Sequence, residues 1–355
     1  MRVRCSPGFI AIPLLALTAC GAPRGPSPAP WTVDPGISTA WIGADSIERP
    51  MVRTWPVMGA MLQVSAWDAD TARALAAMEA AHAAVLRVDS LTSADGPGSE
   101  VAALNRRAGT DSATALSPWT AEMLESARAI AAAAGVDGGA RQVRTDAARR
   151  AWLPRRGMRL DVEGIARGFA IDRARDALRA AGVRRAVVDL GGSFAVLGAA
   201  PVGPRWSVAL ENPFEPGQVY AAVQLDSGAA ATVGDPALVG GRPSEPAHGI
   251  ASVSVIAPTA VLAVALSSAL FSMDPAEGCR LAARHPGVDV IWVRSEEHED
   301  EERDADDGVD PELVVITDTL AERLELLSEE PTDERPTRCS ALLAARAPSP
   351  TPPRP

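Results

Sequence analysis

Two glycines lie four residues apart in the segment DVEGIARGFAID (161–172), which otherwise has the composition of a helix start. Glycine within a helix costs about 0.5–1 kcal/mol relative to alanine, so Gly164 and Gly168 require an explanation. Residues at this spacing share one helical face. A face without side chains either lets a ligand approach the backbone or lets the helix pack closely on a sheet. These residues alone favour neither explanation.

The start of this helix is also suited to binding an anion. Gly164 falls in the first turn, where backbone N–H groups have no helical partner and the helix dipole favours negative charge. The following strand ends in DLGGS (189–193), where Gly191 and Gly192 again allow a ligand to come close to the backbone. These positions together predict a site for a phosphate-bearing or planar ligand.

The elements that must position these residues are helices and strands in separate blocks. Helices are expected over 71–91, 117–135, 164–182 and 259–273. Strands are expected over 184–190, 193–198, 205–211, 219–225 and 250–258. Beyond these, a helix, two strands and a final helix are expected between residues 275 and 327. Strands that follow one another between helical blocks favour the α+β class with a largely antiparallel sheet.

The N-terminus predicts export. Arg2 and Arg4 precede an apolar run that is too short to remain as a membrane span, which is typical of a secretory signal. The end of this run, LTAC followed by Gly21, resembles a bacterial lipobox, in which Cys20 would be lipidated. An ordinary signal peptide with a chance cysteine is the alternative. We expect a signal peptide over 1–19 and a lipid anchor that holds the protein on the exported side of the cytoplasmic membrane or in the periplasm.

The other boundaries follow from composition. A Pro/Gly-rich tether is expected over 20–48, a folded domain over 49–330 with an acidic loop insertion at 295–310, and a Pro-rich disordered tail over 331–355. Cys279 falls in a helical pattern and Cys339 in the tail, so we expect two unpaired thiols. The net charge of −11 argues against a nucleic-acid partner.

Five blocks of the chain resemble the ApbE family of FAD:protein FMN transferases. The central block is LDVEGIARGFAIDRARDALRAAGVRRAVVDLGGSFAVLG. The other four, in the family's order around it, are VMGAML (57–62), SLTSADGPGSEVAALN (90–105), AATVGD (230–235) and ASVSVIAPTAVLAVALSSALFSM (251–273). The resemblance spans residues 50–327 and implies an ApbE-like fold, related to the T-fold, with a mixed, largely antiparallel sheet and packed helices.

The resemblance also implies an activity. Members of the family are exported, bind FAD and a divalent metal, usually Mg²⁺, and cleave the FAD pyrophosphate. They attach FMN to a threonine of an acceptor flavoprotein and release AMP, a protein flavinylation. The chain is therefore expected to be a transferase with FAD and an acceptor flavoprotein as partners. A catalytically impaired flavin-binding lipoprotein and an envelope scaffold protein of the same fold are the alternatives.

The family's functional positions carry over residue by residue. Asp161, Arg167 and Ser268 take catalytic positions, and the metal would be held by the backbone carbonyl of Ala166 and the hydroxyl of Ser268. The positions expected to bind the flavin dinucleotide are Met58, Gly59, Ser99, Glu100, Asn105, Gly164, Gly168, Asp172, Gly191, Gly192, Thr232 and Gly234.

The chain departs from the family pattern at several of these blocks. Val264 stands where the family has its metal-binding aspartate, and valine cannot coordinate a cation. Asp95 replaces a tyrosine that packs on the ligand, and Ala60 replaces a threonine. Arg167 replaces a lysine, but the chain contains no lysine at all, so this exchange carries no information. The metal site is therefore expected to be weakened or rearranged.

Overall fold

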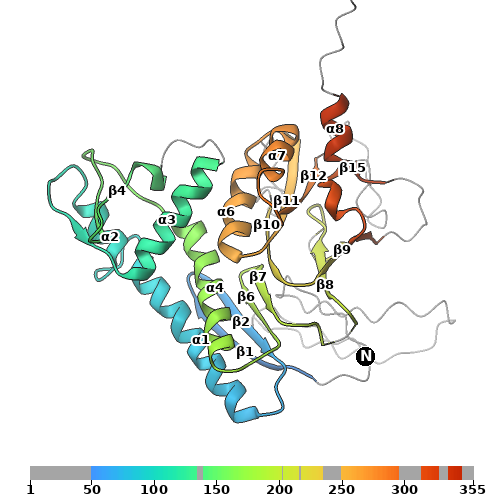
Figure 1. Ribbon diagram of the computed structural model, residues 1–355, viewed down its shortest axis with the longest axis horizontal. Helices are drawn as coiled ribbons and strands as arrows, with labels where there is room; N and C mark the ends of the chain where they lie inside the picture. Colours follow the sequence, from blue (N-terminus) through green and yellow to red (C-terminus); the bar gives the residue numbers. More distant parts are fainter. Residues whose placement is uncertain are drawn as a thin grey trace, which may run out of the picture.

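A nine-stranded sheet runs through the middle of the molecule (Figure 1). The computed structural model describes residues 49–133, 139–201, 203–215, 217–234, 249–295, 313–327 and 335–345. The predicted signal peptide, the tether with Cys20 and residues 296–310 of the acidic segment lie outside these ranges.

The strands of this sheet lie in the order β1-β2-β6-β7-β10-β11-β12-β13-β15. Neighbouring strands are antiparallel, except that β15 runs parallel to β13. The bounds are β1 (Met51–Val57), β2 (Ala60–Ala66), β6 (Ala186–Leu190), β7 (Ser193–Leu197), β10 (Gly228–Gly234), β11 (Ile250–Ala257), β12 (Asp289–Arg294), β13 (Val314–Ile316) and β15 (Thr337–Arg338).

Helices lie on one side of the sheet. They are α1 (Thr71–Thr92), α2 (Glu100–Arg106), α3 (Pro118–Ala133), α4 (Glu163–Ala180), α6 (Ala260–Phe271), α7 (Pro275–Ala282) and α8 (Cys339–Ala345). Some of them are packed on the sheet and others, such as α2 and α3, are packed on other helices. Helix α4 packs between α1 and α6, and α6 lies against β10 and β11 (Figure 1). Among the described residues, no helix is both long enough and apolar enough to cross a bilayer.

A second, three-stranded sheet covers the opposite face. It has the order β14 (Leu324–Leu326), β9 (Val219–Leu225), β8 (Trp206–Glu211). Successive side chains of a strand point to opposite faces, so Ala195 and Val255 pack with the helices, whereas Phe194 and Ile256 pack with Trp206 of β8. The molecule therefore has three layers, and the central strands are buried on both faces. A small outer sheet joins β3 (Thr114–Ala115), β5 (Arg150–Trp152) and β4 (Arg144–Thr145).

The α+β class with a largely antiparallel sheet is confirmed, and the four helices expected between residues 71 and 273 form as α1, α3, α4 and α6. Their ends follow capping chemistry: Asp70 and Thr259 accept hydrogen bonds from the first turns of α1 and α6. The five strands expected between residues 184 and 258 form as β6, β7, β8, β9 and β11.

The C-terminal part differs from the expectation in three respects. The prediction of a final helix before residue 327 is wrong. Asp318–Leu320 form a short 3-10 turn, and Leu324–Leu326 form a strand that pairs with β9. Residues 335–345 of the expected disordered tail form β15 and α8. The expectation of unpaired thiols is also wrong: Cys279 and Cys339 form a disulfide, with their Cα atoms 5.6 Å apart.

Each of these differences has a tertiary cause. The segment AERLELL has helical composition, but the free edge of β9 offers it a strand partner. The pairing of β15 with β13 brings the start of α8 beside α7, and this places the two cysteines together. Neither partner is close in the sequence, so the local pattern carried no sign of them.

Candidate functional site

The start of α6 is held by Asp172, from the middle of α4. The two carboxylate oxygens of Asp172 each accept a backbone N–H, from Ala260 and Val261, at 3.0 Å. The guanidinium of Arg175 lies 2.9 Å from the same carboxylate. Burial raises the pKa of Asp172, while Arg175 and the two N–H groups oppose the rise. Asp172 was expected to contact the flavin dinucleotide, and the structure shows that its carboxylate caps α6.

The two glycines of α4 are bare for different reasons. A Cβ atom on Gly168 would lie 2.5 Å from the carbonyl oxygen of Ala260 and 2.8 Å from the Cα of Val261. Gly168 is therefore required by the close packing of α4 on α6, which was the structural explanation left open above. A Cβ atom on Gly164 would meet nothing within 4 Å, so this exposed turn is open to a ligand.

Charged side chains surround that open turn. Asp161 is exposed, and its Oδ1 atom accepts the N–H of Glu163 at 2.9 Å, which stabilises the helix start. The side chain of Arg167 is 31% exposed and lies 3.8 Å from the carboxylate of Glu163. Its Nε atom is buried and has no hydrogen-bond partner in the described part of the chain. Because part of the side chain is exposed and its ion pair with Glu163 is long, the guanidinium of Arg167 has donor capacity available to an anion.

Three of the other predicted residues hold the framework around α4. Asn105 exchanges two hydrogen bonds with the backbone of Leu160, at 3.0 and 2.7 Å, and so fixes the segment that leads into α4. The hydroxyl of Ser99 caps α2, and the carboxylate of Glu100 accepts the N–H of Ser117 at the start of α3, at 2.9 Å. Their role as ligand contacts stays a prediction, since these bonds are made within the protein.

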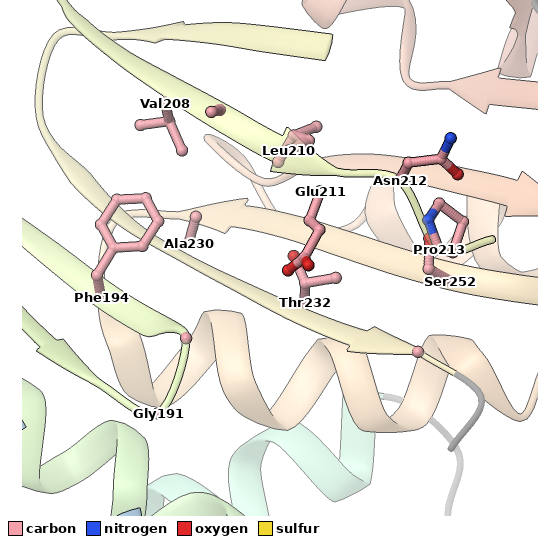
Figure 2. A pocket seen from close by; sticks show the side chains of 13 residues that line it. Gly191, Phe194, Val208, Leu210, Glu211, Asn212, Pro213, Ala230, Thr232 and Ser252 are labelled. Atoms are coloured by element: carbon pink, nitrogen blue, oxygen red, sulfur yellow. The ribbon is translucent and has the colours of Figure 1, made fainter. Parts of the chain in front are cut away.

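A cavity of about 330 Å³ lies between the two sheets, where β8 faces β7, β10 and β11 (Figure 2). Four of the predicted ligand-binding residues line it: Gly191, Gly192, Thr232 and Gly234. The rest of the lining was not predicted from the sequence: Phe194, Val208, Ala209, Leu210, Glu211, Asn212, Pro213, Ala230 and Ser252. The pattern of β8 identified it as a strand but carried no sign of which strands it would face.

The walls of this cavity are mostly apolar, with a few oriented polar groups. Phe194, Val208 and Ala230 lie together at one end, while the carboxylate of Glu211 projects toward Thr232 (Figure 2). Glu211 also accepts the N–H of Gly217 at 2.6 Å. Apolar walls with few polar groups are typical of sites for aromatic ring systems.

Two hairpin turns meet beside the cavity. Gly191 and Gly192 form the β6–β7 turn with φ of 59° and 87°, in the left-handed region that glycine adopts without strain. A Cβ atom on Gly191 would lie 2.9 Å from the Cβ of Ala60, which follows the β1–β2 turn. Met58 and Gly59 form that turn, so the pairing of β2 with β6 brings these four predicted residues together.

The residues expected to hold Mg²⁺ do not fit a cation. Ser268 is exposed, and its hydroxyl donates to the carbonyl oxygen of Val264 at 3.3 Å. Val264 is aliphatic, and Ala166 is buried within α4 and could offer only a backbone carbonyl. Mg²⁺ prefers an octahedron of oxygen ligands with at least one carboxylate. Across the described residues, no group of three or more His, Cys, Asp or Glu side chains is placed to hold a metal.

Comparison with solved structures identifies the class of fold. The ApbE protein of Thermotoga maritima superposes with a TM-score of 0.59 at 21% identity, covering 72% of this chain and all (100%) of that one. The flavin transferase ApbE of Vibrio cholerae gives a TM-score of 0.60 at 17% identity, covering 70% of this chain and 94% of that one. The chain thus has the fold of the ApbE flavin transferases.

The sequence comparisons confirm the resemblance to the ApbE family, whose model matches residues 136–292. The FAD:protein FMN transferase of Treponema pallidum is 32% identical over 163 residues, which cover 40% of this chain and 45% of that protein. The enzyme of the same name from Rhodobacter capsulatus is 35% identical over 140 residues, covering 36% of this chain and 26% of that protein. The matched part thus spans less than half the length of these relatives.

Proposed function

We propose that this protein is an FAD:protein FMN transferase, which transfers FMN from FAD to a threonine of an acceptor flavoprotein and releases AMP. The names of its relatives support this activity. The observation that carries the proposal is the cavity between the two sheets. The glycine pair Gly191 and Gly192 is far in the sequence from Thr232 and Gly234. All four match the family's flavin-binding positions, and all four line this one cavity.

The size of the cavity limits what it can hold. About 330 Å³ is near the lower end of the range of small-ligand sites, so one ring system fits and a whole dinucleotide does not. The diphosphate therefore has to lie outside the cavity. The carboxylate of Glu211 repels phosphate but suits a ring that carries N–H donors.

The reaction needs positioning and charge neutralisation more than covalent help from the protein. The threonine hydroxyl oxygen of the acceptor attacks the phosphorus of the FMN half, the P–O bond to AMP breaks, and the hydroxyl proton passes to a base. Asp161 and Arg167, on the exposed start of α4, are the candidates for accepting that proton and for pairing the diphosphate charge. No step is assigned to a metal, because the residues at the implied site do not fit one.

We also propose that the protein works on the exported side of the cytoplasmic membrane, anchored there through a lipid on Cys20. Disulfides form and persist in oxidising compartments and are rare in the cytosol. The Cys279–Cys339 disulfide therefore supports export independently of the N-terminal signal.

A flavin-binding protein that no longer transfers FMN is the second candidate, and Val264 is the specific observation in its favour. Incubation of the full chain with FAD and a threonine-bearing acceptor peptide separates the two. The transferase gives AMP and a covalently flavinylated peptide in equal amounts. Bound FAD without AMP release would establish the second candidate, and absence of any FAD binding would exclude both.

A further inference from the structure

The junction of α4 and α6 is where the ApbE resemblance implies a divalent cation. We infer that flavin binding by this chain does not depend on such a cation, and that Val264 is the single position that separates this junction from a cation site. The inference rests on the proposed function, because it concerns how the same dinucleotide is held.

The register of the two helices determines which residues meet. The carboxylate of Asp172 sits at the N-terminal end of α6, bonded to Ala260 and Val261. Gly168, one turn earlier in α4, packs against the first turn of α6. The helices therefore run antiparallel, and the first turn of α4 lies alongside the turn of α6 that carries Val264.

Oxygen ligands are too few at this junction. The side chain of Val264 has no lone pair, and the residue is only 7% exposed. The hydroxyl of Ser268 is hydrogen-bonded to the carbonyl oxygen of Val264. Of the carboxylates on this part of α4, Asp172 is paired with Arg175 and caps α6, while Asp161 and Glu163 lie on the exposed turn, where Asp161 accepts the N–H of Glu163. One hydroxyl and one backbone carbonyl cannot replace the water shell of Mg²⁺.

The charge of the diphosphate then needs another partner. Among the residues of the predicted site, Arg167 is the only cation. Its side chain is 31% exposed, and its ion pair with Glu163 is long, at 3.8 Å. A guanidinium is permanently charged and can bind two phosphate oxygens at once. Arg167 is therefore assigned the charge that the cation supplies in the family.

The first test compares FAD affinity, followed by flavin fluorescence, in excess MgCl₂ and in excess EDTA. The full wild-type chain should give dissociation constants that agree within about twofold. A loss of affinity of about tenfold or more in EDTA would overturn the inference. This arm needs no variant, so it stands even if the substitutions below impair folding.

The second test adds the missing carboxylate. Val264→Asp should acquire Mg²⁺ dependence, with FAD affinity at least about tenfold higher in MgCl₂ than in EDTA. Val264→Asn has nearly the same shape without the charge and should show no such dependence. If Val264→Asp stays folded and does not respond to Mg²⁺, Val264 is not the position that decides cation binding.

A measurement without flavin separates failure of this inference from failure of the proposed function. Mn²⁺ bound per chain is counted from the loss of the free-ion signal in electron paramagnetic resonance. Val264→Asp should bind one more ion than the wild type and than Val264→Asn. Ions held by acidic segments elsewhere are the same in all three proteins, so they do not affect this difference. Equal Mn²⁺ binding by all three proteins would contradict the inference, whether or not the wild type binds FAD.

Discussion

At the scale of single residues, the spacing of two glycines raised a question that only the structure resolves. Gly164 and Gly168 lie on one face of α4. The sequence predicted that this face lacks side chains, but it did not indicate why. The structure gives them separate causes, because α6 presses on Gly168 and open space lies beyond Gly164. Tertiary contacts of this kind are not encoded in local spacing, so ligand contact and close packing could not be told apart.

The two glycines make a matched pair of substitutions. Gly168→Ala should lower the free energy of unfolding by about 1–3 kcal/mol, because the new methyl group collides with the backbone of α6. Gly164→Ala should raise it by about 0.5–1 kcal/mol, because alanine is the better helix former and meets nothing. Urea denaturation measures both. Equal effects of the two substitutions would show that Gly168 is not packed more closely against α6 than Gly164 is.

Asp172 should contribute to stability through α6. Asp172→Ala removes the acceptor of two buried N–H groups and should lower the free energy of unfolding by about 2–4 kcal/mol. Asp172→Asn retains one acceptor oxygen and should be less damaging. If Asp172→Ala is less stable but its folded molecules bind FAD as tightly as the wild type, Asp172 has a structural role. If only the FAD affinity falls, Asp172 contacts the ligand.

The same residue predicts a pH effect with a definite sign. Burial raises the pKa of Asp172 above its ordinary 3.8, so the native protein holds this proton more tightly than the unfolded chain does. The stability that comes from this difference is fully present below pH 3.8 and is lost as the pH rises through the raised pKa. The difference in the free energy of unfolding between the wild type and Asp172→Asn should change with pH across this range, because carboxyls such as Asp68 and Asp146 titrate equally in both proteins.

At the scale of elements, most helices and strands could be predicted from periodicity and capping residues, but their arrangement could not. The strand pattern of β8 and β9 was clear, and nothing local indicated that they leave the main sheet and lie over it. The cavity exists because of that crossing. This explains why predicted residues in the β6–β7 turn and on β10 were found in the cavity lining, while the lining residues of β8 were missed.

Filling the cavity should block flavin binding. Val208→Trp places a large ring among the lining residues and should weaken FAD binding at least about tenfold. Ser207 is the matched control, because it adjoins Val208 on β8 but is outside the lining, and its hydroxyl accepts a hydrogen bond from Gln224 of β9. Ser207→Trp should bind FAD like the wild type. Thermal melting of both variants verifies folding, and equal affinities would show that FAD binds elsewhere.

At the scale of the whole molecule, the C-terminal end of the folded part is organised differently from the expectation. Local composition placed residues 335–345 in a disordered tail, yet they add β15 to the sheet edge and are joined to α7 by the Cys279–Cys339 disulfide. Long-range pairing and covalent links are the features that a single sequence encodes least directly. The family resemblance, by contrast, predicted the fold correctly over nearly all of the described chain.

The disulfide should contribute measurably to stability. It links residues 60 positions apart, and Cys339→Ser should lower the free energy of unfolding by about 2–4 kcal/mol. The wild type in the presence of a reductant should melt like this variant, while the variant itself should not respond to the reductant. A wild type whose melting is insensitive to reduction would indicate that the two thiols are not joined.

The most direct test of the account is a crystal structure of the full chain with FAD. The account predicts the density of one ring system of FAD between β8 and the β6–β7 turn, in contact with Phe194, Gly191 and Gly192, with the diphosphate running out toward the start of α4. An FAD molecule bound with this cavity empty, or a cavity closed by the protein's own side chains, would contradict it.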